Sequence, residues 1–281
     1  MSRVDEILMM AKAVPPFPKV AHRVLAMLDD PSVKAADLAE IIQYDAAITA
    51  NILKICNSAL FGLHRKITSL DEALVVLGQD ELKDVIITSS SAKFYKGTVG
   101  AGYDLGQGDL WKHSVACAVV ARQLAPKIAG ANPSAAFTTA LLHDIGKRFM
   151  SSFVADELKR ILVMVDVKKM SFVEAEQKVL GMTHAELGGM ILEKWEFDPE
   201  MATAVRCHHD PDALEKGPLA ATIALANAVV VSLGIGGGAD GLATRLQGDG
   251  MKKFGIDAAT IESCMADLLF ELEKAQEVLN L

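Results

Sequence analysis

The sequence predicts an all-α protein, with many helices arranged in two packed helical subdomains. Apolar residues recur at helical spacing, helix-start signals recur along the chain, and no segment alternates with period two. Hydrophobic residues make up 51% of the 281 residues, whereas aromatic residues make up only 5%. The core is therefore expected to be aliphatic, which suits packed helices.

The first half is predicted to be a series of short helices. Ser69 and Glu72 match a capping box, in which two side chains satisfy backbone N–H groups at a helix start. Apolar periodicity predicts further helices over residues 37–42, 45–56 and 80–89.

A glycine-rich segment follows. Residues 96–109 contain five glycines, too many for a helix interior. We therefore predict a division into subdomains 1–100 and 101–281 there.

The second half carries stronger helix signals. Ser171 with Glu174 and Thr183 with Glu186 match capping boxes, and Asp198-Pro199 provides an N-cap followed by proline. Apolar patterns predict helices over residues 113–124, 135–142 and 256–279, a buried helix within 221–235, and a glycine-rich surface loop over 234–250.

Several function classes are disfavoured by composition. The net charge of −8 argues against general nucleic-acid binding, because such binding depends on Lys and Arg neutralising phosphates. No apolar stretch reaches the length of a membrane span, and the N-terminus has no signal-peptide pattern, so we expect a cytoplasmic protein. The four separated cysteines are expected to be reduced core thiols.

Histidines and an aspartate form the candidate site. Five of the seven histidines lie between residues 113 and 209, namely His113, His143, His184, His208 and His209. Asp144 follows His143 where an apolar helix is expected to end, so both side chains can enter one pocket. Imidazoles with a carboxylate suit a divalent-metal site, and a carboxylate can bridge two ions. Satisfied core or capping histidines are the alternative.

Nearby cations suggest a phosphate ligand. Lys147 places a positive charge close to Asp144, and Arg206 lies within one turn of His208. His22 and His64 stand alone and are expected to be structural or at the surface.

The sequence resembles the HDOD domains, a branch of the HD superfamily of metal-dependent phosphohydrolases. The resemblance is carried by Val-Pro-Pro-Phe-Pro at residues 14–18, Tyr-Asp-Ala-Ala-Ile-Thr at 44–49, Cys-Asn-Ser-Ala-Leu-Phe-Gly at 56–62, Ala-Leu-Val-Val-Leu-Gly at 73–78, and the His-Asp pair. It implies an all-α fold and a role in bacterial signalling or regulation.

The chain also resembles the HD-GYP phosphodiesterases of cyclic di-GMP. Their ligand order of His, His-Asp, His, His-His and Asp is matched by His113, His143, Asp144, His184, His208 and His209, with Asp144 as the bridge. The final aspartate falls at Asn227, so the last metal ligand of that order is expected to be a neutral amide oxygen in place of an anionic carboxylate, or to be lost. The Gly-Tyr-Pro signature is absent after His209, so the substrate specificity does not carry over. Asp109 is a candidate replacement carboxylate.

Three functions remain open from the sequence. The resemblance implies two divalent ions, with Fe, Mn, Zn or Ni as candidates, and a nucleotide or cyclic dinucleotide as ligand. In a signalling domain these ligands control binding to a protein partner, whereas in a phosphohydrolase Asp144 and Lys147 take part in catalysis. A purely structural domain would bind no metal.

Overall fold

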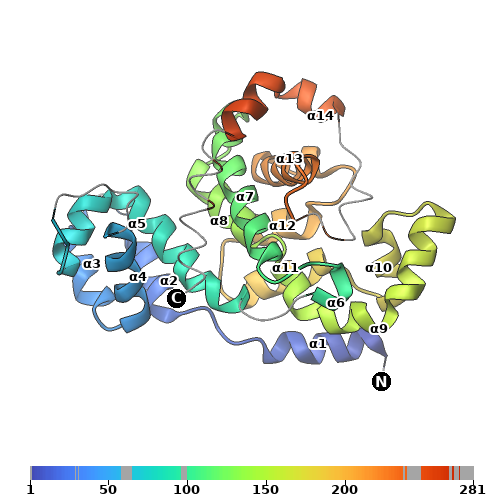
Figure 1. Cartoon of the computed structure of the whole chain (residues 1–281), viewed down its shortest axis with the longest axis horizontal. Helices are drawn as coiled ribbons and strands as arrows, with labels where there is room; N and C mark the ends of the chain where they lie inside the picture. Colours follow the sequence, from blue (N-terminus) through green and yellow to red (C-terminus); the bar gives the residue numbers. More distant parts are fainter. Residues whose placement is uncertain are drawn as a thin grey trace. The chain divides into compact units, whose positions relative to one another are not determined.

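The structure is a computed structural model that describes residues 2–28, 30, 32–57, 65–95, 100–236, 238, 248–265, 268 and 272. Every regular element among these residues is helical, which confirms the predicted fold class (Figure 1). The chain forms two compact units. The smaller unit contains Pro16–Lys93, and the larger unit contains Met1–Pro15 and Phe94–Leu272. The division predicted at residues 100 and 101 stays a prediction.

The smaller unit contains α2 (Lys19–Leu28), α3 (Ala35–Ile42), α4 (Ala46–Cys56) and most of α5 (Leu70–Tyr95). The predicted helices over 37–42 and 45–56 correspond to α3 and α4. Asp45 caps α4 by accepting hydrogen bonds from the N–H groups of Ala47 and Ile48 at 3.1 and 3.0 Å. Within α5 the backbone is non-helical at Gly78, with φ 73° and ψ 175°. A positive φ favours glycine. The break at Gly78 separates the predicted helix that begins after Ser69 from the one predicted over residues 80–89.

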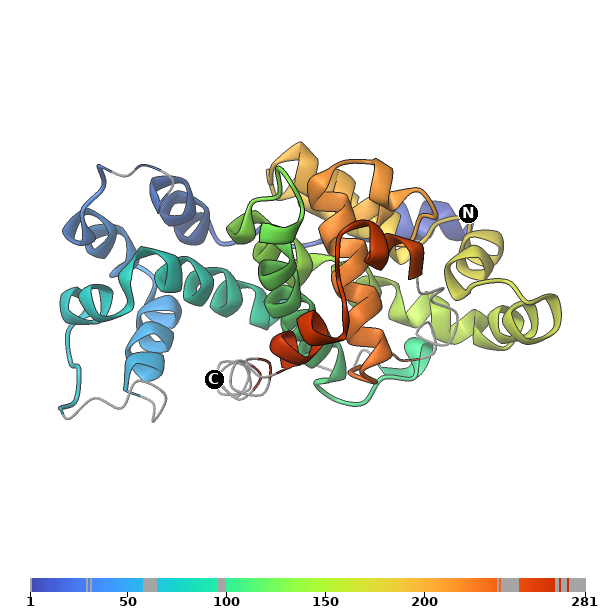
Figure 2. The same ribbon diagram turned by 90° about the horizontal axis from the view of Figure 1, so that it is seen from above.

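The larger unit contains all the predicted site residues. Its helices are α1 (Arg3–Ala13), α6 (Gly100–Tyr103), α7 (Asp109–Leu124), α8 (Pro133–Leu142), α9 (Ile145–Lys168), α10 (Phe172–Leu180), α11 (His184–Lys194), α12 (Pro199–Cys207), α13 (Pro218–Ser232) and α14 (Gly248–Lys253). Helix α7 packs against α8 and α13, and α11 packs against α9 and α12. In Figure 2 the orange ribbon of α13 runs beside the green ribbons of α7 and α8.

Local capping signals begin the helices that carry the site. Ser171 with Glu174 and Thr183 with Glu186 form complete capping boxes, as predicted. Asp198 caps α12 by accepting from the N–H of Glu200 at 2.7 Å. These caps matter for the site because Thr183 makes His184 the first residue of α11.

The glycine-rich segments differ from the sequence expectation. Helix α6 lies within residues 96–109, where helix was excluded, because Gly102 packs without a side chain against the backbone of α9 at Ser151. In the expected surface loop, a Cβ at Gly236 would lie 2.8 Å from the carbonyl oxygen of Asp109 and 2.8 Å from His113 Cβ. The start of this loop therefore packs on α7, and α14 occupies its end.

The predicted last helix lies only partly within the described residues, of which 258–265 are helical. The second half of the motif at residues 56–62, and His64, lie outside them. Within the described part of the chain, no helix has both the length and the hydropathy required to cross a membrane.

Candidate metal centre

His143 and Asp144 form the junction between α8 and α9. His143 is the C-cap of α8 and Asp144 is the N-cap of α9, and both side chains are fully buried. The Asp144 side chain makes no capping hydrogen bond, so its carboxylate is available to the interior. A Cβ at Gly146 would collide with the carbonyl oxygen of His184. Glycine at this position therefore lets the start of α9 approach the start of α11.

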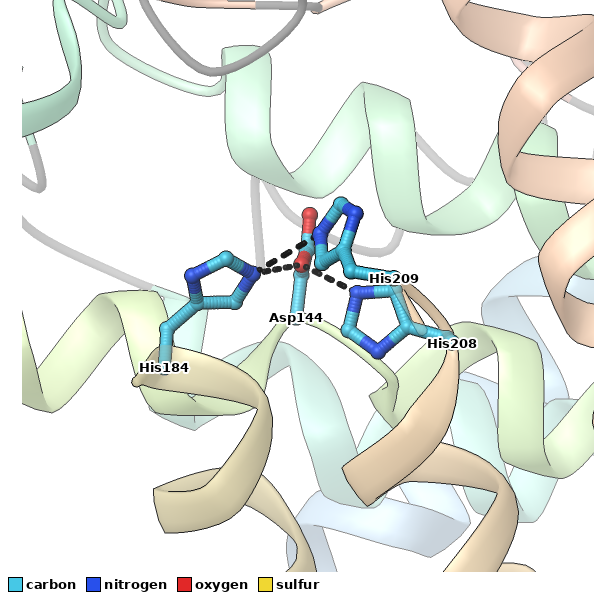
Figure 3. Close-up of side chains that lie close together, drawn as sticks. All are labelled: Asp144, His184, His208 and His209. Carbon is cyan, nitrogen blue, oxygen red and sulfur yellow. Dashed lines mark hydrogen bonds and ion pairs between the residues drawn. The ribbon is translucent and has the colours of Figure 1, made fainter. Parts of the chain in front are cut away.

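Four imidazoles direct their Nε2 atoms at the two oxygens of Asp144. His113 Nε2 and His143 Nε2 lie 3.4 and 3.3 Å from Oδ2. His184 Nε2 and His208 Nε2 lie 3.5 and 3.6 Å from Oδ1 (Figure 3). Each carboxylate oxygen therefore faces two imidazoles. We call Oδ2 with His113 and His143 the Oδ2 side, and Oδ1 with His184 and His208 the Oδ1 side.

His209 adds a third imidazole to the Oδ1 side. Its Nε2 lies 3.1 Å from His184 Nε2, and its ring centroid lies 4.0 Å from that of His208 (Figure 3). Asp144, His184, His208 and His209 each offer one ligand atom, and these atoms lie within 4.8 Å of one another. His209 is half-buried, whereas the other three are buried. The Oδ1 side therefore reaches the edge of the core at His209.

Hydrogen bonds at Nδ1 fix the orientation of the four rings. The Nδ1 atoms of His143 and His208 each lie 2.6 Å from a backbone carbonyl oxygen, of Ala140 and Val205 respectively. Those of His113 and His184 lie 2.9 Å from the carbonyl oxygen of Ile235 and from a carboxylate oxygen of Glu176. Because these oxygens accept hydrogen bonds, the protons belong on Nδ1. The Nε2 lone pairs then face Asp144.

This arrangement fits a divalent cation. His143 Nε2, His208 Nε2 and Asp144 Oδ1 are buried and have no hydrogen-bond partner among the described residues. Lone pairs aimed at a carboxylate repel it unless a cation lies between them. A tetrahedral ion with bonds of about 2.0–2.1 Å separates its ligand atoms by about 3.4 Å. The observed Nε2–oxygen separations of His113 and His208, 3.4 and 3.6 Å, are close to that value.

The protonation states of the cluster also suit a cation. Burial lowers the pKa values of His113 and His208 to about 4, and it lowers that of His209 well below its ordinary value. Burial opposes ionisation of Asp144, but the interactions of the carboxyl with His143 and with the Lys147 ammonium outweigh it and lower the pKa of the carboxyl. Neutral imidazoles around an ionised carboxylate are the donor forms that a divalent ion requires.

Lys147 contacts Asp144 directly. Its Nζ donates to Asp144 Oδ2 at 2.6 Å, and its side chain is only 3% exposed. An ammonium group at this distance compensates the charge of the buried carboxylate. Lys147 was predicted as a phosphate contact, and that role stays a prediction.

The other predicted polar residues lie in different surroundings. Arg206 Nη2 pairs with Glu193 at 2.5 Å, so its charge is already partnered. Asp109 accepts a hydrogen bond from the N–H of Gly106 at 2.8 Å and is not among the clustered ligand groups found in the described residues. Asn227 is buried in α13, and its Oδ1 has no hydrogen-bond partner.

Glu176 is a site residue that the sequence analysis missed. It is fully buried and accepts from both the backbone N–H and Nδ1 of His184, each at 2.9 Å. Its other oxygen accepts from the hydroxyl of Tyr103 at 2.5 Å. One sequence feature could have identified Glu176: its carboxylate lies beside the apolar residues that form the buried face of α10, which include Phe172 and Ala175.

Burial alone lowers the pKa of His184, but the charge and hydrogen bond of Glu176 outweigh it, so the pKa is raised. Glu176 thus acts on the cluster through His184. A metal-ligating histidine whose second nitrogen binds a carboxylate is a common arrangement in metal sites.

The whole-chain comparisons agree with the fold. The HDOD domain model matches residues 14–211, and the chain belongs to this family. An uncharacterized protein of Treponema pallidum (strain Nichols) is 24% identical over 232 residues, which cover 81% of this chain and 43% of that protein. The chain thus spans less than half the length of this curated relative.

Solved structures share the helical architecture. An HDOD domain protein of unknown function from Geobacter sulfurreducens has a TM-score of 0.73 and 23% identity, covering 98% of this chain and 99% of the other. A candidate signal transduction protein from Marinobacter aquaeolei VT8 has a TM-score of 0.74 and 18% identity, covering 100% of this chain and 61% of the other. At these identities the likeness establishes the fold.

Proposed function

We propose that this chain is a signalling and regulatory HDOD domain that holds two divalent metal ions, one on each side of Asp144. In this proposal the ions bind a phosphoester ligand such as a nucleotide or cyclic dinucleotide. The observation that carries it is the convergence of four Nε2 atoms on one buried carboxylate, with the Nδ1 atoms held by other groups. The similar protein from Marinobacter aquaeolei VT8, named for signal transduction, supports the regulatory role.

In this proposal, different residues hold each ion and contact the ligand. His184, His208 and His209 hold an ion on the Oδ1 side, and His113 and His143 hold one on the Oδ2 side. When bound, divalent ions neutralise phosphoryl charge and lower the pKa of a coordinated water molecule. The half-buried His209 marks the edge from which a ligand approaches, and the Lys147 ammonium adds positive charge beside Asp144.

Elemental analysis of freshly purified protein tests the metal claim. The expected result is Fe, Mn, Zn or Ni at up to two ions per chain, as the two ligand groups allow. Asp144→Asn should lose most of the metal, whereas Asp109→Asn, which changes a carboxylate outside the cluster, should retain it. Protein that contains no metal and takes up none after reconstitution would refute the proposal.

Calorimetric titration of a nucleotide and cyclic-dinucleotide panel into metal-loaded protein tests the ligand claim. Binding should disappear on metal removal and return on reloading. A regulatory domain should also change its affinity for a protein partner when the ligand binds. Ligand binding that is equal in metal-free and metal-loaded protein would contradict the proposed role of the ions.

A metal-dependent phosphohydrolase is the second candidate. The buried Lys147, bonded to Asp144 at 2.6 Å, favours it because fixed positive charge beside the site can stabilise negative charge in phosphoryl transfer. Hydrolysis of bis(p-nitrophenyl) phosphate or of a nucleotide by metal-loaded protein would establish it. If the protein binds members of the panel and hydrolyses none, the phosphohydrolase is excluded and the regulatory function remains.

A further inference from the structure

The Oδ2 side has a thiol beside its two histidines. His113, Cys117 and His143 each offer one ligand atom, and the three atoms lie within 4.8 Å of one another. Cys117 follows His113 by one helical turn on α7, which places both side chains on one face. The Cys117 Sγ lies 3.6 Å from His113 Nε2, and all three residues are buried. The cluster therefore contains a sulfur donor that the ligand order of the sequence analysis omits.

The two sides of Asp144 differ in their number of donors. The Oδ1 side has a carboxylate oxygen and three imidazoles, which suffice for a tetrahedral ion. Within the described part of the chain, the Oδ2 side has a carboxylate oxygen and two imidazoles. The position where an acidic ligand was expected holds Asn227, whose amide carries no charge. Among the residues that the structure describes, Cys117 is therefore the group placed to supply a fourth, anionic donor to the Oδ2 side.

We propose that Cys117 is a ligand of the ion on the Oδ2 side, together with His113, His143 and Asp144. The inference rests on the proposed function, because it assumes that the cluster binds metal. The unpartnered Nε2 of the fully buried His143 supports it independently of the thiol, since this nitrogen points into the same cluster. A thiolate among nitrogen donors favours zinc or another soft or borderline ion over magnesium or calcium.

Coordination changes the protonation of Cys117. Without metal, Sγ and His113 Nε2 are hydrogen-bonding partners, and the proton on His113 Nδ1 leaves Nε2 as the acceptor of the thiol proton. If Cys117 holds the ion, a sulfur–metal bond would replace its S–H bond and the proton would pass to the solvent, because a coordinating cation deprotonates a thiol. Lys147 uses one lone pair of Asp144 Oδ2. An oxygen of a carboxylate retains a further acceptor site for the ion.

Cobalt titration tests this inference through a spectroscopic signature that only sulfur coordination produces. The full chain is stripped with a chelator and titrated with Co²⁺, and the near-ultraviolet thiolate-to-cobalt charge-transfer band is recorded beside the bound cobalt. The wild type should show the band as the ion on the Oδ2 side binds. Cys117→Ser should lose the band and bind this ion about tenfold or more weakly.

Cys207→Ser is the matched control. Cys207 is also a buried thiol of the larger unit and directly precedes the ligand His208, but its Sγ lies 3.8 Å from the carbonyl oxygen of Ala204. This variant should retain the band. Cys117→Asp provides a second test if serine impairs folding, because it should restore an anionic donor and bind both ions without the band.

The outcomes separate the two claims. Wild-type protein that binds cobalt without the band, or a band that survives in Cys117→Ser, would overturn the assignment of Cys117 and leave metal binding intact. A band lost only in Cys207→Ser would also overturn it. Wild-type protein that binds no cobalt at all would overturn the proposed function and this inference together.

Discussion

Acid should destabilise the metal-free protein, because His113 and His208 are buried as neutral imidazoles. Their pKa values are lowered by burial from 6.5 to about 4. Below pH 6.5 the unfolded chain therefore binds more protons than the folded protein, and the free energy of unfolding falls as the pH falls. This loss continues until the pH reaches about 4, where the folded protein also protonates.

The size of the effect follows from the two pKa values. One pKa unit corresponds to about 1.4 kcal/mol, so each imidazole accounts for about 2 kcal/mol between about pH 6.5 and pH 5. The two together give about 4 kcal/mol, a large part of the roughly 5–15 kcal/mol that stabilises an ordinary domain. His184 acts in the opposite direction, because Glu176 raises its pKa despite the effect of burial.

Urea unfolding in the presence of a chelator, followed by circular dichroism at about pH 7 and about pH 5, measures this difference. Replacing both His113 and His208 with glutamine should reduce the pH dependence by about their joint 4 kcal/mol, whereas His209, whose pKa burial also lowers, continues to contribute. His22→Gln is the matched control, because His22 is a half-buried histidine of the smaller unit, and it should retain the dependence. A loss below about 1 kcal/mol in the wild type, or an undiminished loss in the double variant, would refute the reasoning.

Three substitutions test the surroundings of the site. Gly146→Ala should lower the free energy of unfolding by about 1–3 kcal/mol in urea titrations, because its Cβ collides with the His184 carbonyl; an unchanged midpoint would contradict this. Glu176→Gln should weaken metal binding by about 10- to 100-fold in chelator competition, because a neutral amide supports the His184 ring less, and equal affinity would contradict the role of the carboxylate. Tyr103→Phe should have a smaller effect in the same assay, since it removes one hydrogen bond to Glu176 and leaves its charge, and a larger loss would reverse this ranking.

Helix positions were predictable because their signals are local. The caps at Ser171, Thr183 and Asp198 satisfy N–H groups two or three residues away, so a short stretch of sequence contains the whole interaction. The glycine segments were less predictable. Whether Gly102 interrupts a helix or lies within one depends on its contact with Ser151, which is distant in sequence. Tertiary packing decides such positions.

The candidate ligands could be predicted from their residue types, but the groups that hydrogen-bond to their Nδ1 atoms could not. His143 and Asp144 are adjacent in the sequence, and the proximity of other histidines suggested a cluster. The support of His113 by the Ile235 carbonyl joins residues 122 positions apart, and no local pattern encodes it. Cys117 was expected to be a core thiol because its apolar neighbours conceal its position one turn after His113. The folded structure shows that the face of α7 that carries Cys117 is directed at Asp144.

The Nδ1 hydrogen bonds also have a consequence for the mechanics of the larger unit. The four rings are held by groups from α8, α10, α12 and the segment after α13, and all four rings meet at Asp144. An ion drawn between these rings would place four separate segments under a common constraint. Loss of the ion should then increase amide hydrogen exchange in all four segments together, so that parts of the chain that are far apart in sequence respond to whether the buried centre is occupied.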